Sequence, residues 1–142
     1  SALSGHCQCG GVRYEISGDL GPTIYCHCSQ CRRASGSAFA ANASARTGDV
    51  KFIAGSDLIH EYESSPGKFR AFCSRCGSPL YARRITRPDT LRMRLGTLDD
   101  AQGVHPQGHI WVDSKAHWFR ITDELAQYPA NAPDTLSLKG SS

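Results

Sequence analysis

The sequence lacks both a long hydrophobic run and a strong excess of charge of either sign. No window of the 142 residues approaches the roughly 18 apolar residues of a membrane-spanning helix. Sixteen Lys and Arg residues against thirteen Asp and Glu residues leave a formal charge of +3, with no basic block of the kind that binds nucleic acid. We therefore expect neither a membrane nor a nucleic acid as partner, and the sequence does not address the oligomeric state.

The opening stretch SALSGHCQCGG lacks the basic and apolar regions of a secretion signal. Without such a signal the expected location is cytoplasmic, where clustered thiols more often bind metal or do chemistry than form disulfides. The seven cysteines are also odd in number, so a closed set of disulfides would leave one thiol unpaired. Cysteines separated by a single residue rarely reach relaxed disulfide geometry with each other.

Strong helix signals are also scarce, and short alternating runs dominate instead. Residues 12–16, 58–62 and 91–95 alternate with a period of two, and turn-forming clusters such as RTGD and AGSD separate the runs. This pattern predicts a mainly β fold of eight to ten short antiparallel strands. Single helical turns are predicted only in SQCRRASGS and TDELAQY.

The length and composition suit one globular domain. A chain of 142 residues with 39% apolar residues can bury one continuous core and is too short for two comfortable ones. We predict a domain over residues 1–128 and an extended or disordered tail over residues 129–142, which are rich in Pro, Ser and Ala. The two tryptophans, Trp111 and Trp118, are expected to pack in the core.

Two cysteine pairs together match a structural zinc site. In a strand, residues two apart project to one face, so CQCG would present two sulfurs side by side. CSRCG is a Cys-x2-Cys knuckle, and Gly77 follows it at a position that often needs a positive φ. The four candidate ligands of this all-thiolate site are Cys7, Cys9, Cys73 and Cys76.

The stretch CHCSQC leaves Cys26, Cys28 and Cys31 to close on a second ion. Three protein ligands leave one tetrahedral position open, which is typical of a catalytic zinc. Spacing does not force this division, because Cys26 and Cys28 could instead share an ion with the CSRCG knuckle. A closed second site, with His27, His6 or a distant histidine as fourth ligand, is another alternative. An iron–sulfur cluster fits less well, since known runs space their cysteines differently.

Several of these stretches resemble the glutathione-dependent formaldehyde-activating enzyme family, which also contains centromere protein V. The matching stretches are GHCQCGGVRYE, CHCSQCRRASGSAFAAN, FCSRCGSPLY, and GTLDD followed by HIWVDSKAHWF. The resemblance implies a fold similar to the Mss4-like β-tent or barrel and two zinc ions per chain. It assigns the four-cysteine set to a structural zinc and Cys26, Cys28 and Cys31 to a catalytic one.

The resemblance also implies an activity, with a thiol and an aldehyde as small-molecule partners. Family members condense glutathione, the expected co-substrate, with formaldehyde to give S-hydroxymethylglutathione; the class name, carbon–sulfur lyase, describes the reverse reaction. Two other functions remain open. One is a non-catalytic, zinc-stabilised binding or scaffold module, and the other is a thiol and zinc redox buffer that releases zinc on oxidation.

Five residues are candidate contacts for the thiol substrate. Arg32 and Arg33 follow the three cysteines and could pair with carboxylates, or form a solvated basic surface. Ser37 could supply a hydroxyl or belong to a turn, and Asn42 could orient a ligand or serve as a turn or edge amide. His109 could carry a proton, complete the zinc site, or be a hydrogen-bonded structural histidine.

Overall fold

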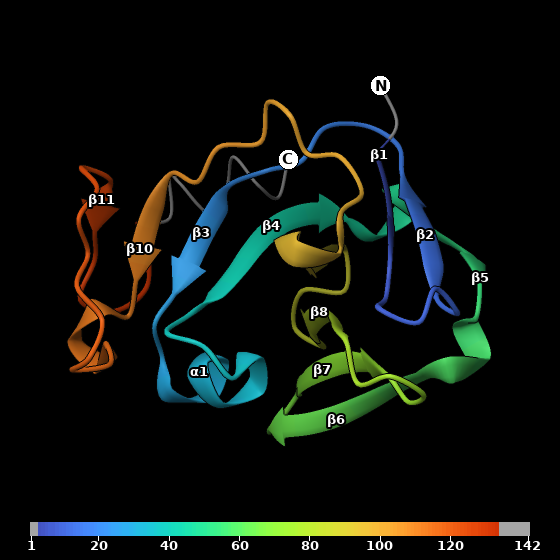
Figure 1. Ribbon diagram of the computed structural model, residues 1–142, viewed down its shortest axis with the longest axis horizontal. Coiled ribbons are helices and arrows are strands. Elements are labelled where there is room, and N and C mark those ends of the chain that lie inside the picture. Colours follow the sequence, from blue (N-terminus) through green and yellow to red (C-terminus); the bar gives the residue numbers. More distant parts are fainter. Residues whose placement is uncertain (1–2, 134–142) are drawn as a thin grey trace.

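Two β-sheets make up most of the structure, a computed structural model that describes residues 3–133. One sheet has three strands in the order β1-β2-β5, and the other has eight in the order β11-β10-β3-β4-β9-β8-β7-β6. Figure 1 shows the small sheet at one end of the molecule and the large sheet running from β11 at the opposite end to β6. The mainly β architecture predicted from the alternation is confirmed, and it is consistent with the Mss4-like fold that the family resemblance implies.

The small sheet consists of β1 (Leu3–His6), β2 (Arg13–Ile16) and β5 (Val50–Ala54). The large sheet consists of β3 (Thr23–Cys26), β4 (Ala40–Arg46), β6 (Ile59–Ser65), β7 (Lys68–Cys73), β8 (Pro79–Arg84), β9 (Thr90–Arg94), β10 (Gly108–Ile110) and β11 (Ala126–Gln127). Within the described residues, the only α-helix is α1 (Ser29–Ser35). Short 3-10 turns are η1 (Thr47–Asp49), η2 (Ser56–Leu58), η3 (Leu95–Thr97) and η4 (Val112–Ser114).

Most strand pairs are antiparallel, as expected, but one edge of the large sheet is parallel. There β10 runs parallel to β3, with Ile110 opposite Cys26, and β11 runs parallel to β10. The helical turn predicted in SQCRRASGS is confirmed as α1, whereas the one predicted in TDELAQY is wrong. In that segment the Asp123 carboxylate accepts a hydrogen bond from the Leu125 N–H, and the chain then pairs with β10 as β11. Sheet pairing therefore outweighs the local helix signal.

The large sheet has one apolar face and one polar face because its residues alternate. In β9, Leu91 and Met93 are buried in the main core, while Arg92 and Arg94 project to the opposite side with the pocket described below. The small sheet covers the apolar face. Buried residues of the main core include Val12, Tyr14, Ile16, Ala45, Ala71, Leu80, Leu91 and Met93.

One close backbone contact fixes the small sheet against the loop that carries its cysteines. Gly55 has φ of 76°, and a Cβ atom added there would lie 2.0 Å from the carbonyl oxygen of Gly11. Only glycine allows both the left-handed backbone conformation and this approach. The loop between β1 and β2 is thereby held against the end of β5.

The expectation that both tryptophans pack in the core is half wrong. Trp118 is 73% exposed, whereas Trp111 is partly buried against a second, smaller core around Ile24 and Ile110. Alternation ends at Trp111, whose φ is 58°, because the chain leaves β10 there and turns into η4. The period-two alternation of a strand therefore does not predict which residues are buried beyond Ile110.

Part of the predicted tail lies against the body of the domain. The carbonyl oxygens of Pro129 and Ala130 accept hydrogen bonds from Asp113 and Trp111 respectively. Residues 134–142 lie outside the described residues, so the domain boundary after residue 128 stays a prediction. Among residues 3–133, no helix is long and apolar enough to cross a membrane.

Candidate metal centres and pocket

Four cysteine sulfurs meet where the small sheet joins the end of β7. Those of Cys7, Cys9, Cys73 and Cys76 lie within 4.8 Å of one another. The expected strand geometry for Cys7 and Cys9 is wrong, because both follow β1 in a turn in which the Gly10 N–H bonds to the Cys7 carbonyl. The expected positive φ at Gly77 is confirmed, at 81°. A turn after β1 and the knuckle at the end of β7 bring these sulfurs together, so no strand face is involved at Cys7 and Cys9.

The surroundings of this first cluster favour the thiolate form at Cys9 and Cys76, whereas burial raises the pKa of Cys73. The Val12 N–H donates to the Cys7 sulfur at 3.3 Å and the Gly11 N–H to the Cys9 sulfur at 3.4 Å. The Gly11 bond, followed by that of the Arg75 guanidinium at 3.4 Å, lowers the pKa of Cys9. Thiolates are the form that binds metal, so this donor set fits a tetrahedral ion such as zinc.

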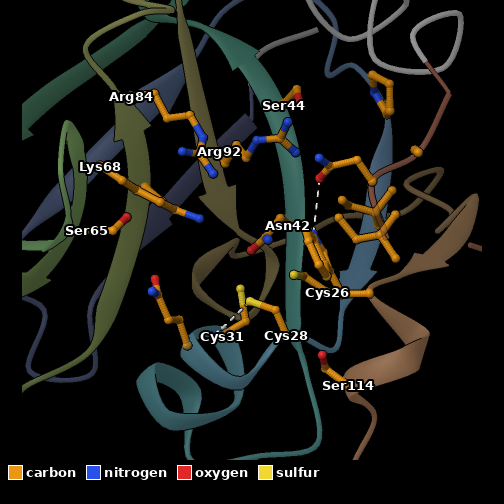
Figure 2. Close-up of a pocket in the computed structure, with 18 of the residues that line it drawn as sticks. Cys26, Cys28, Cys31, Asn42, Ser44, Ser65, Lys68, Arg84, Arg92 and Ser114 are labelled. Carbon is orange, nitrogen blue, oxygen red and sulfur yellow. Dashed lines mark hydrogen bonds between the residues drawn. The ribbon is translucent and has the colours of Figure 1, made fainter. Parts of the chain in front are cut away.

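A second cluster of three sulfurs forms where β3 passes into α1. Cys26 is the last residue of β3, Cys28 caps the helix, and Cys31 lies in its first turn. The Cys31 N–H donates to the Cys28 sulfur at 3.3 Å, and the three sulfurs lie within 4.8 Å of one another. Figure 2 shows the sulfurs directed toward a common point. A strand end and a helix start, rather than a single strand face, position them.

No fourth histidine, cysteine or carboxylate within residues 3–133 joins this second cluster. Although His27 lies between two of its cysteines, its Nε2 hydrogen-bonds to Nδ1 of His109 at 2.8 Å. His109 in turn hydrogen-bonds through Nε2 to Asp123 at 3.0 Å, and His6 pairs with Asp99 at the surface. The described residues therefore offer three ligands here, and the alternative of a closed site gains no support from them. Each cluster could hold a metal ion, and the seven cysteines fall into the predicted groups of four and three.

A pocket of about 830 Å³ opens over the three-sulfur cluster. The cysteine sulfurs lie at one end of it, and basic side chains reach into it from β7, β8 and β9 (Figure 2). No Asp or Glu is among its lining residues in the described chain. The basic lining residues are Lys68, Arg84, Arg87, Arg92 and Arg94.

Alternation in the strands explains why so many cations gather here. Arg92 and Arg94 occupy every second position of β9, opposite Ser44 and Asn42 of β4. The same face receives Lys68 from β7. The alternation over residues 91–95 was recognised from the sequence, but the arginines between the apolar positions were overlooked. That alternation was the signal by which these residues could have been found.

Burial perturbs the cations nearest the sulfurs. Arg94 is 8% exposed, and its guanidinium donates to the Asn42 side-chain oxygen. Burial lowers the pKa of Arg94 to about 10, an effect that the nearby Cys31 sulfur partly offsets. The pKa of Arg92 is also lowered, first by burial and then by repulsion from Arg87 and Arg84.

Arg70 supports the three-sulfur cluster from outside the pocket lining. Its Nη1 donates to the Cys31 sulfur at 3.6 Å and its Nε to the Ser64 hydroxyl at 3.2 Å. The pKa of Cys31 is lowered, first by hydrogen bonds from the Cys26 and Cys28 thiols and further by Arg70. The neighbouring thiols and Arg70 thus stabilise one negative charge of the cluster beside a buried guanidinium, against the opposing effect of burial.

The five predicted substrate contacts lie in different places. Asn42 lines the pocket, whereas Arg32, Arg33 and Ser37 lie on or just after α1 and are not among the lining residues. His109 is buried in the hydrogen-bonded row with His27, outside the lining. Contact of these five residues with a substrate stays a prediction.

Comparison with known proteins gives concordant results. The model of the family described as glutathione-dependent formaldehyde-activating enzyme matches residues 2–114. A protein of Halomonas elongata, provisionally named a glutathione-dependent formaldehyde-activating enzyme, is 31% identical over 128 residues, covering 84% of this chain and 80% of that protein. The crystal structure of a Rhodobacter sphaeroides protein is similar with a TM-score of 0.59 and 27% identity, covering 72% of this chain and 91% of that one.

Proposed function

Because the chain belongs to the glutathione-dependent formaldehyde-activating enzyme family, we propose that it condenses a thiol with formaldehyde or a related small aldehyde. The reaction would take place beside Cys26, Cys28 and Cys31, and its reversal is a carbon–sulfur lyase activity. The observation that carries the proposal is that these three sulfurs converge at one end of a pocket without a fourth donor from the described residues. Glutathione, named in the family's description, is the first thiol to test.

Zinc is the ion that both donor sets fit best. Sets of three or four clustered thiolates, with N–H groups directed at their sulfurs, match its preference for sulfur ligands. The four-cysteine set would hold a structural ion, and Cys26, Cys28 and Cys31 a catalytic one. Zinc bound by the three cysteines would favour the deprotonated form of a thiol placed beside it.

The chain's own residues would prepare the site for that thiol. Arg70 and the first turn of α1 direct N–H groups at the sulfurs of Cys31 and Cys28 and so stabilise their negative charge. Asn42, fixed by Arg94, lines the pocket and can orient a polar group of the substrate. Holding the two reactants together in this space removes much of the entropic cost of their encounter.

The chemical step is an addition to a carbonyl group. A sulfur lone pair of the substrate thiol forms the C–S bond, and the π electrons of the C=O bond move to oxygen. The proton lost by the thiol ends on that oxygen, so the product is a hydroxymethyl thioether and no oxidant or reductant is needed. Formaldehyde is a reactive electrophile, so the main contribution of the protein is a deprotonated, positioned nucleophile.

Exchange NMR tests the proposal directly. Glutathione, formaldehyde and their adduct would be mixed with the zinc-loaded protein, with the Cys28→Ser variant, or with no protein. We expect cross-peaks between free and adduct methylene signals to grow faster with the wild type only, by at least tenfold over the uncatalysed rate. Circular dichroism would show that the variant keeps its fold.

The same experiment separates the other functions. The exchange would also be measured with other thiols and small aldehydes. If every sample exchanges at the uncatalysed rate, the proposed enzymatic activity is rejected and the scaffold module remains. Release of zinc at oxidant concentrations that spare ordinary zinc enzymes, without exchange, would instead indicate the redox buffer.

A further inference from the structure

The pocket has two chemically different ends. Along β4, Ala40 lies opposite Cys26, Asn42 opposite Arg94 and Ser44 opposite Arg92. Four strand residues span about 13 Å, so the row of Ser44 and Arg92 is well separated from the sulfurs. Figure 2 shows Arg84, Arg92 and Lys68 on the side of the pocket away from the cysteines. We call Lys68, Arg84 and Arg92 the cationic end.

Within the part of the chain that the structure describes, the cationic end has no protein counter-ion. Within residues 3–133, none of its three side chains forms an ion pair with an acidic residue, and no Asp or Glu lines the pocket. Lys68 and Arg92 are partly buried, where an uncompensated charge is costly. The Cys31 sulfur accepts a hydrogen bond from Arg70, and the negative charge of the sulfur cluster offsets only part of the effect of burial on Lys68 and Arg92. The described residues thus leave a place for an anionic ligand at this end.

Repulsion among the cations of this end also indicates an anionic ligand. The pKa of Lys68 is lowered by burial and then by Arg70, with a further contribution from Arg84. Repulsion from Arg84 also acts on Arg92. These side chains are therefore close enough to disfavour one another's charge, and a bound dianion would relieve that repulsion.

A zwitterionic thiol satisfies this end poorly. Apart from its thiol, glutathione carries two carboxylates and one ammonium group, a net charge of −1, and no carboxylate of the described lining could pair with that ammonium. A phosphate monoester carries a charge of about −1.5 to −2 at pH 7 and three acceptor oxygens. Guanidinium groups bind such oxygens bidentately, and the hydroxyls of Ser44 and Ser65 line the same region.

We propose that the thiol accepted by this pocket bears a phosphate group and no ammonium group, with its sulfur beside the three cysteines and its phosphate at the cationic end. The inference rests on the proposed function, because it identifies the substrate class of the same site.

Two thiols that differ only in phosphate provide the test. Binding of 4′-phosphopantetheine, pantetheine and glutathione to the zinc-loaded protein would be measured by calorimetry. We expect 4′-phosphopantetheine to have a Kd at least tenfold lower than either of the others. The double variant Arg84→Gln/Arg92→Gln should lose that preference, and Arg13→Gln, an exposed change in β2 of the small sheet, should retain it. Equal affinities of the two pantetheines, or tighter binding of glutathione, would overturn the inference.

Catalysis distinguishes failure of this inference from failure of the proposed function. Formaldehyde exchange accelerated equally with all three thiols would overturn the phosphate preference and leave the enzyme intact. Phosphate-dependent binding that the double variant abolishes, without accelerated exchange for any thiol, would support the ligand class and reject the condensation reaction.

Discussion

At the scale of single residues, Arg70 shows how one side chain can support a cluster of candidate metal ligands without being one of them. It is 7% exposed, it contacts the Cys31 sulfur, and its Nη2 has no hydrogen-bond partner among residues 3–133. A guanidinium buried in this way lies where it can balance the negative charge of three thiolates around a divalent ion. It therefore serves as a positioning residue for the cluster.

Replacement of Arg70 by Met should weaken the metal at the three-cysteine cluster. The Cys31 sulfur would lose its charged donor, and loss of such a supporting contact typically lowers metal affinity by about tenfold to a hundredfold. Competition between the Co²⁺-loaded protein and a chelator would measure this metal affinity. In the variant, one of the two equivalents of cobalt should be released at a lower chelator concentration than in the wild type. Arg13→Gln is the control, and an unchanged chelator profile for Arg70→Met would contradict this role.

The side chain of Glu61 gives a second prediction at this scale. It accepts two hydrogen bonds from the Arg83 guanidinium, at 2.7 and 2.8 Å, and one from the Tyr81 hydroxyl at 2.6 Å. These bonds, that of Arg83 first, lower the pKa of Glu61 below its ordinary value of 4.5. A lowered folded-state pKa contributes stability above the unfolded-state pKa, and that stability is lost as the pH falls through the folded-state value.

Glu61→Gln should therefore lower the free energy of unfolding at pH 7 by about 1 kcal/mol, a value kept small because the pair is partly exposed. Urea unfolding from pH 7 down to pH about 3 would also show a weaker loss of stability toward acid than in the wild type. Glu15→Gln, in the small sheet, is a control. Parallel pH curves for Glu61→Gln and wild type would refute the assignment.

At the scale of secondary-structure elements, two glycines with similar φ have different surroundings. Gly55 follows β5 against the backbone of the cysteine-bearing loop, whereas Gly36 ends α1 with φ of 68° and nothing within 4 Å of an added Cβ. Both need the left-handed conformation, but only Gly55 also needs the missing side chain. The comparison separates backbone strain from steric exclusion.

Gly36→Ala should lower the free energy of unfolding by about 1 to 2 kcal/mol, because only the left-handed conformation is unfavourable there. Gly55→Ala should cost more than about 3 kcal/mol, because the added Cβ would also force β5 from the Gly11 carbonyl. Chemical denaturation of the two variants measures the difference. Equal losses would show that the loop of the small sheet adjusts freely.

At the scale of the whole molecule, the two cysteine clusters join different amounts of chain. The four-cysteine cluster connects the loop after β1 with the turn between β7 and β8, and so ties the small sheet to the large one. The three-cysteine cluster lies within residues 26–31 and joins only β3 to α1. Loss of a metal should therefore have unequal effects on stability.

Cys9→Ser should lower the Tm much more than Cys28→Ser, by roughly 10 °C or more, since removal of a structural metal typically removes several kcal/mol. Differential scanning calorimetry with matched metal analysis would test this, with one metal equivalent lost in each variant. A larger effect of Cys28→Ser would reverse the proposed division between structural and catalytic ions.

The sequence predicted the cysteine groups better than the geometry that forms them. Ligand counting allowed the pairing of CQCG with CSRCG, and the family resemblance favoured it. The turn at Gly10 and the helix cap at Cys28 depend on backbone contacts that spacing alone does not specify. The parallel strand β10 was likewise missed, because three residues carry little periodic signal. The pocket arginines were visible in the alternation, yet their convergence required the order of β7, β8 and β9 in the sheet.

The alternation in β9 separates two tasks along one strand. Leu91 and Met93 support the folded state, while Arg92 and Arg94, lying between them, determine the charge that a guest molecule meets. Substitution of Arg92 and Arg94 could therefore change the ligand preference while Leu91 and Met93 keep the core intact. A shift of the strand register by one residue would exchange the two faces and place the guanidinium groups in the hydrophobic core. The arginines that set the binding preference therefore also disfavour the wrong register.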